Sequence, residues 1–189
     1  MKVNGNTLRT GNVIEHQNRL WRVVNTQHTQ PGKGGAYMQV ELKELKDGTK
    51  LNERFRASET VEKIRLDQTP YQFLYQDTHG YTFMNQENYE QITIGEDVID
   101  QEQVPYLKEG VEVVVETYEE SPIGITLPET VTFEVVEADA VVKGQTAASS
   151  YKPAILENGL KVSVPPHITT GTKIVVNTTT GKYLERAKD

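Results

Sequence analysis

Residues 20–42 read LWRVVNTQHTQPGKGGAYMQVEL, and this stretch decides the fold of the N-terminal part of the chain. Residues 20–24 are rich in β-branched and aromatic side chains, and residues 37–42 alternate apolar with polar ones, so both segments are predicted strands. The connection between them carries one proline and three glycines, which is typical of a loop that needs unusual φ angles. The stretch therefore predicts a β-hairpin with Lys33 at its tip.

Lys33 has no acidic neighbour nearby in sequence, the nearest being Glu15 and Glu41. A lysine without a buried partner is expected to project into solvent on its flexible stem. One interpretation is an ordinary solvated lysine. Another is a lysine presented for covalent modification or for insertion into the active site of a partner.

A phosphate-binding P-loop is a further interpretation of Gly32-Lys33, and the sequence argues against it. That motif needs a glycine five positions before Gly32 and a serine or threonine after the lysine. This chain has Gln27 and Gly34 at those positions, and the loop leads into a predicted strand rather than into a helix N-terminus.

Composition favours several small β-barrels over one large core, because hydrophobic residues make up 36% of the 189 residues and aromatic residues only 7%. There are no cysteines, which fits an intracellular protein. Residues 1–6 do not resemble a signal peptide, and no window is apolar enough to span a membrane. We expect a cytoplasmic protein with no membrane partner.

The net charge of −7 is unevenly distributed. Residues 1–63 contain 11 basic and 7 acidic side chains, residues 64–127 contain 2 and 13, and residues 128–189 contain 7 and 7. A basic N-terminal part suits a phosphate-bearing partner, whereas the acidic middle part suits a protein partner or simply aids solubility.

The same three ranges are the predicted domains, and the fold class is all-β with three small barrels. In residues 1–63, Lys46-Asp47-Gly48-Thr49 predicts a second hairpin turn. We expect Trp21 in the core or barrel wall rather than stacked on a base. Arg54 and Arg56 should lie on one side of a strand, where they either meet RNA phosphate or form a solvated face.

In residues 64–127 the aromatic residues are expected to pack a core or wall rather than to stack bases, because acidic residues surround them; they are Tyr71, Phe73, Tyr75, Tyr81 and Phe83. Pro122 and Pro128 mark a boundary to residues 128–189. There, Asn158-Gly159 predicts a hairpin, and residues 143–150 form either an RNA-contacting or a plain loop.

Signals for enzymatic chemistry are weak. The four histidines are scattered without metal-ligand spacing, and no G-x-S-x-G motif is present. We expect no catalytic residue, no metal site and no cofactor.

Several motifs together carry a resemblance to a known family: PGKGGA at residues 31–36, LNERFR at 51–56, ENYEQ at 87–91, and a C-terminal run from YKPA at 151–154 to GKY at 181–183. Across essentially its whole length, the chain resembles bacterial elongation factor P, a ribosomal factor related to the hypusine-bearing translation factor of eukaryotes and archaea.

The resemblance implies a monomer with a KOW/SH3-like barrel and two OB-type barrels in an L-shaped, tRNA-like arrangement. Such a factor is not an enzyme. It binds the ribosome (rRNA) beside the peptidyl-tRNA and relieves stalling on consecutive prolines. Lys33 would carry the modification, added by a lysine-modifying enzyme, with Pro31, Gly32, Gly34 and Gly35 shaping its loop. β-Lysylation is favoured, while another lysine modification or none remains open.

The resemblance also implies contacts outside the tip loop. Gly144, Gln145 and Thr146 stand where the family reads Gly-Asp-Thr and approaches the mRNA exit-site codon; Gln145 keeps hydrogen-bonding groups but loses the carboxylate. Tyr183 and Arg186 match positions near the tRNA anticodon stem, or form a solvated strand face. Two alternatives stay open: a general single-stranded nucleic-acid-binding OB-fold protein, and a paralogue of the factor that acts outside stalling.

Overall fold

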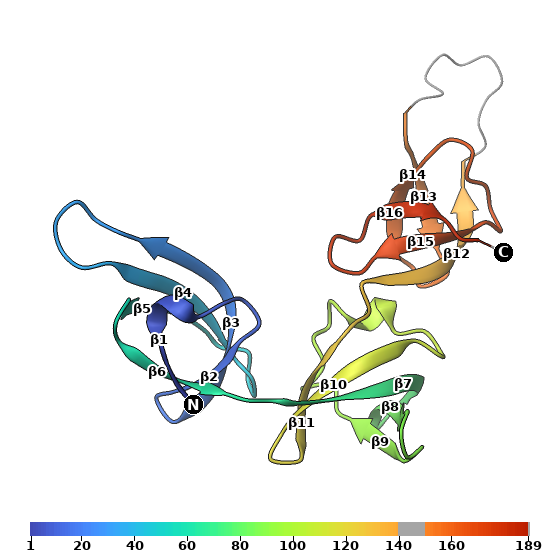
Figure 1. Cartoon of the computed structure of the whole chain (residues 1–189). Coiled ribbons are helices and arrows are strands. Elements are labelled where there is room, and N and C mark those ends of the chain that lie inside the picture. The colour runs from blue at the N-terminus through green and yellow to red at the C-terminus, as the bar shows by residue number, and fades with distance from the viewer. Residues whose placement is uncertain (140–149, 189) are drawn as a thin grey trace. The chain divides into compact units, whose positions relative to one another are not determined.

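The computed structural model of the chain describes residues 1–139 and 150–188, and its regular structure there is β-strands with two 3₁₀ helices (Figure 1). The strands form three sheets, so the predicted all-β class with three small β domains is confirmed. The chain divides into two compact units, one of residues 1–68 with 116–123 and the other of residues 69–115 with 124–189. Neither of these helices, in the described ranges, is long and apolar enough to cross a membrane.

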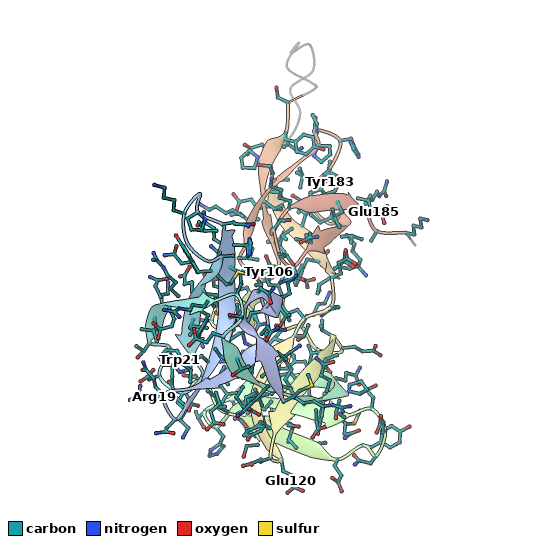
Figure 2. All side chains as sticks on the ribbon, turned by 60° about the vertical axis from the view of Figure 1, so that its left-hand side comes forward. Arg19, Trp21, Tyr106, Glu120, Tyr183 and Glu185 are labelled. Carbon is teal, nitrogen blue, oxygen red and sulfur yellow. The ribbon has the colours of Figure 1, made fainter. Side chains whose placement is uncertain are left out.

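The first sheet has the strand order β1-β6-β2-β3-β4-β5. Its strands are β1 (Lys2–Asn4), β2 (Val13–His16), β3 (Arg19–Thr29), β4 (Tyr37–Glu44), β5 (Lys50–Arg56) and β6 (Thr60–Ile64), with the 3₁₀ helix η1 (Gly5–Thr7) after β1. Val23, Val40 and Leu42 are fully buried on the core side of β3 and β4. Trp21, labelled in Figure 2, is 3% exposed, which confirms its predicted place in the core, and its Nε1 donates to the carbonyl of His16 at 2.8 Å.

The predicted hairpin is present, but β3 continues five residues beyond the predicted end at Val24. A β-bulge between Val23 and Asn25 shifts the register, and residues 25–29 then pair with residues 37–41 of β4. These five residues are polar, and their pairing depends on backbone hydrogen bonds that any side chain permits. In Figure 1, the loop between β3 and β4 forms the free end of this ribbon.

The second sheet has the order β11-β10-β7-β8-β9. Its strands are β7 (Asp67–Asp77), β8 (Gly80–Asn85), β9 (Gln91–Ile94), β10 (Glu112–Tyr118) and β11 (Ser121–Thr126), with the 3₁₀ helix η2 (Val104–Tyr106) between β9 and β10. Phe73, Tyr81 and Phe83 are buried as predicted, and Tyr71 is partly buried against the same core.

The prediction for Tyr75 was wrong, because its side chain is 50% exposed. A register shift between Phe73 and Tyr75 places Phe73 opposite Phe83, but Tyr75 opposite Thr82. One extra residue in a strand reverses the face of every side chain beyond it, so Tyr75 leaves the core side.

The third sheet has the order β14-β13-β12-β15-β16. Its strands are β12 (Thr130–Ala138), β13 (Lys152–Leu156), β14 (Lys161–Val164), β15 (Lys173–Asn177) and β16 (Tyr183–Arg186). The predicted hairpin at Asn158-Gly159 joins β13 to β14, with Gly159 at a φ of +84°. Phe133, Val135, Ile174 and Val176 are among the residues that fill its core.

Lys108, which follows η2, ties the second and third sheets together within their shared compact unit. Its Nζ donates to the carbonyl of Thr132 at 3.3 Å and to Oε1 of Glu157 at 2.8 Å. The same Oε1 accepts the amide of Glu134 at 2.9 Å. Burial opposes ionisation of Glu157, but the hydrogen bonds from Lys108 and Glu134 outweigh it and lower the pKa of the carboxyl.

We predict that Glu157→Gln lowers the free energy of unfolding at neutral pH by about 0.5–1 kcal/mol, because the pair is partly exposed. A carboxyl with a lowered folded-state pKa stabilises the fold above its ordinary pKa of 4.5, and that contribution disappears as the pH falls through the folded value. The difference between wild type and Glu157→Gln in urea denaturation should therefore shrink below pH 4.5. Glu112→Gln, at an exposed acid on β10, is the control. A difference that stays constant with pH would contradict the prediction.

Candidate functional site: the lysine loop and the adjoining arginines

The loop of residues 30–36 presents Lys33 to solvent. Gly32, Lys33, Gly34 and Gly35 are all exposed, and Pro31 is half-buried. Gly34 has a φ of +102°, in the left-handed region that favours glycine, and a Cβ added to Gly32, Gly34 or Gly35 would meet no atom within 4 Å. The loop closes where the amide of Ala57 donates to the carbonyl of Ala36 at 3.0 Å. Its open surroundings leave the lysine accessible on all sides of the tip.

The strands behind the loop display a second set of exposed or half-buried residues on one side of the sheet, which we call the arginine face. Strand pairing places Gln27 opposite Gln39 and Gln39 opposite Arg54, and likewise places Thr29 opposite Tyr37 and Tyr37 opposite Arg56. Residues paired across antiparallel strands share one face of the sheet. The arginine face therefore comprises Gln27, Thr29, Tyr37, Gln39, Arg54 and Arg56, while Met38 and Phe55 point to the core.

Arg54 and Arg56 are both exposed on either side of the buried Phe55, which confirms that they share one side of β5. The Cζ atom of Arg54 lies 4.2 Å from the centroid of the Tyr37 ring, in a cation–π contact. Tyr37 and Arg54 are diagonal neighbours across β4 and β5. This diagonal places the guanidinium over the ring.

Two carboxylates near the arginine face are engaged elsewhere, and a third, Glu41, lies on the same face of β4, opposite Asn52. Glu53 points away from this face and its Oε2 lies 2.6 Å from His16 Nε2, while Oε2 of Glu59 accepts the backbone amide of Arg56 at 3.1 Å. Over residues 1–139 and 150–188, the ion pairs of the structure involve neither Lys33 nor Arg54 nor Arg56. The loop and the arginine face thus carry three positive charges with neutral hydrogen-bonding groups between them, and Glu41 lies at the edge of the face.

A glycine far away in sequence supports the strand that bears the arginines. A Cβ on Gly5 would lie 2.9 Å from the carbonyl oxygen of Arg56 and 2.9 Å from the Cβ of Phe55. Its amide donates to the carbonyl of Glu59 at 2.8 Å, which fixes η1 against the turn that follows β5. The absence of a side chain at Gly5 therefore sets the position of the end of β5.

The other predicted contact residues lie in the third sheet. Tyr183 and Arg186 are on β16, where Figure 2 labels Tyr183 and Glu185. Tyr183 is half-buried, and its ring meets the exposed Tyr151 edge-on at 6.4 Å. Burial, together with the nearby Tyr151, raises the pKa of its hydroxyl. Gly144, Gln145 and Thr146 lie outside the described residues.

A one-residue bulge in β16 determines which way Tyr183 and Arg186 face. Tyr183 pairs with Val176 and Arg186 with Ile174, so one extra residue of β16 is accommodated between them. Without the bulge, residues three apart would point to opposite faces. The bulge instead gives both residues partners on the same side of β15.

In the part of the chain that the structure describes, no three histidine, cysteine, aspartate or glutamate side chains gather closely enough to hold a metal ion.

Comparison with family models covers nearly the entire chain. Residues 4–61 match the elongation factor P KOW-like domain, residues 66–125 the elongation factor P OB domain, and residues 131–186 the elongation factor P C-terminal domain. The chain belongs to the elongation factor P family. Family membership makes it a translation elongation factor, as the resemblance implied.

Two curated relatives named elongation factor P agree with this assignment. Elongation factor P of Zymomonas mobilis is 57% identical over 99% of this chain and 100% of its own length, and elongation factor P of Sphingopyxis alaskensis has the same identity and coverage. Among solved structures, eukaryotic translation initiation factor 5A from Methanococcus jannaschii matches with a TM-score of 0.49 at 22% identity. That match covers 68% of this chain and 92% of that chain.

Sequence reasoning missed the contact of Tyr37 with Arg54 on the arginine face. The sequence feature that could have predicted this contact is the short turn at residues 45–49. This turn fixes the pairing of β4 with β5 and so places Tyr37 diagonally across from Arg54. Reading the register outward from that turn would have predicted the contact.

We predict that Gly5→Ala lowers the free energy of unfolding by about 1–3 kcal/mol, because the new methyl group must displace the backbone of β5. Gly35→Ala is the matched control, since its Cβ enters open space and its φ is not left-handed. It should change the free energy by no more than about 0.5 kcal/mol. Urea denaturation of both variants measures this, and equal stabilities would refute the close approach at Gly5.

Proposed function

We propose that this elongation factor P family member binds the ribosome beside the peptidyl-tRNA and stimulates peptide-bond formation at stalled, proline-rich sequences. The observation that carries the proposal is the exposed Lys33 in the loop between β3 and β4, beside Arg54 and Arg56 of the arginine face, which form no ion pair among the described residues. Full-length similarity to proteins named elongation factor P supports it.

The Lys33 loop acts on the acceptor end of the tRNA. A long, hydrated amine attracts phosphate as a point charge, and the open loop lets it approach without steric conflict. Contacts from Lys33 and the arginine face hold the acceptor end in a reactive orientation. Correct orientation of reacting groups can lower an activation barrier by several kcal/mol, so the factor accelerates a reaction whose catalyst remains the ribosome.

Lys33 is also the proposed site of modification by a lysine-modifying enzyme. The exposed tip gives such an enzyme access from several sides. A β-lysyl group would lengthen the side chain and add a further amine, which extends its reach towards the acceptor end.

The remaining contacts have two sources. The strand alternation that exposes Arg54 and Arg56 suits them to tRNA or rRNA phosphate. The family resemblance assigns Tyr183 and Arg186 to the anticodon stem and residues 144–146 to the exit-site codon. The domain limits 1–63, 64–127 and 128–189 remain predictions, each close to one matched family model.

The test is synthesis of a reporter with a Pro-Pro-Pro run in a translation system depleted of the factor. Wild-type protein purified from its own cells should relieve the stall, and Lys33→Ala should reduce that stimulation by about tenfold or more. Lys33→Arg keeps the charge but cannot accept a lysine modification, so partial activity there separates charge from modification. Lys161→Ala, at an exposed lysine of β14, should act like wild type.

Intact mass and a proline-free reporter complete the experiment. If modified wild-type protein fails to relieve the stall, the proposal is wrong. If binding to unrelated oligonucleotides is strong, salt-dependent and unchanged by Lys33→Ala, the protein is instead a general single-stranded nucleic-acid binder.

A further inference from the structure

We propose that Tyr37 is a positioning residue, which holds the guanidinium of Arg54 in a fixed plane so that it binds an RNA phosphate with two parallel hydrogen bonds beside the Lys33 loop. The inference rests on the proposed function and adds to it a second anchoring point on the RNA. Neither the fold nor the family resemblance required this role for Tyr37.

The geometry of the pair supports preorganisation. The guanidinium lies 4.2 Å from the ring centroid, and Tyr37 is half-buried on a strand that is paired on both sides. A guanidinium stacked on an aromatic face keeps its N–H groups in its own plane, above the ring, where the planar fork can meet two oxygens at its edge. The flexible side chain of Arg54 thus loses part of its conformational freedom before any ligand arrives.

The donors of Arg54 are available for a ligand. Among the described residues, its guanidinium makes no hydrogen bond or ion pair. Other arginines of the same compact unit are engaged: Arg22 donates to the carbonyl of Gly11 and to Glu116, and Arg9 donates to the carbonyls of Asn6 and Leu8. Arg54 is therefore held in place by a ring yet has no acceptor of its own.

The surroundings favour a nucleic-acid backbone. Gln39 lies opposite Arg54, and Thr29 lies opposite Tyr37, so uncharged donors and acceptors lie beside the guanidinium. Glu41, a carboxylate of the same face, lies between Asn25 and Asn52, and no ion pair joins it to Arg54 among the described residues. Arg56 follows two residues further along β5, about 6.8 Å away on the same face, which lets each arginine take a separate phosphate. Phosphates are the groups that position a protein on RNA, and arginine binds them bidentately.

The experiment titrates each protein into the Pro-Pro-Pro reporter system and measures both the concentration for half-maximal stimulation and the maximal rate. Tyr37→Phe keeps an aromatic face and should match wild type. Tyr37→Leu removes the face and should raise the half-maximal concentration about two- to fivefold with the maximal rate unchanged. Arg54→Lys keeps the charge without the planar fork and should show a similar rise. Tyr75→Leu, at an exposed tyrosine of β7, is the control and should match wild type.

A double variant tests whether Tyr37 acts through Arg54. If Tyr37 acts through Arg54, adding Tyr37→Leu to Arg54→Lys should cause little further loss. The inference is overturned if Tyr37→Leu or Arg54→Lys matches wild type, if Tyr37→Phe is as weak as Tyr37→Leu, or if the two losses multiply. If Tyr37→Leu fails to fold, the half-maximal concentrations of Arg54→Lys and Tyr37→Phe still test the inference.

Lys33→Ala separates this inference from the proposed function. Loss of stimulation in Lys33→Ala with full activity in the Tyr37 and Arg54 variants leaves the proposed function standing and rejects the role of Tyr37. Full activity of Lys33→Ala rejects the proposed role of the Lys33 loop, and failure of the modified wild-type protein to relieve the stall rejects the proposed function itself.

Discussion

The backbone ladder that joins β3, β4 and β5 is the constraint on which the site depends. One register sends Met38 and Phe55 into the core and Tyr37 and Arg54 to the outside. Because side chains alternate along a strand, a slip of one residue would expose the core residues and bury the charges. Core packing therefore enforces the arrangement of the binding surface, and the apolar residues act on function without touching a ligand.

The structure separates two ways of attracting phosphate. The tip loop offers a mobile point charge at Lys33, whereas the arginine face offers a rigid, planar donor at Arg54. The flexible amine of Lys33 can follow a phosphate that moves. The fixed guanidinium of Arg54 binds well only a phosphate that presents its oxygens in the matching orientation. The two lie within one sheet, so they are placed relative to each other by strand pairing rather than by domain movement.

Much of this could be predicted from the sequence, because the determining signals are local. Gly34 and the flanking strands indicated the hairpin, and the alternation around Phe55 placed the two arginines on one face. The errors came from bulges. The extra residue after Phe73 turned Tyr75 outward, since a bulge is set by tertiary pairing and leaves little trace in the periodicity. The close approach of Gly5 to the end of β5 could not be predicted either, because the two segments lie about fifty residues apart in the sequence.

The bulge between Val23 and Asn25 has a mechanical consequence. Beyond it, β3 continues as five polar residues, about 17 Å of strand at about 3.4 Å per residue. These residues stay paired with β4, which is itself paired with β5 and buries Met38 and Val40 there, so the sheet and its core hold the strands up to the last pair, Thr29 with Tyr37. Only the loop of residues 30–36 extends past that pair, and its length therefore limits how far Lys33 moves relative to the arginine face.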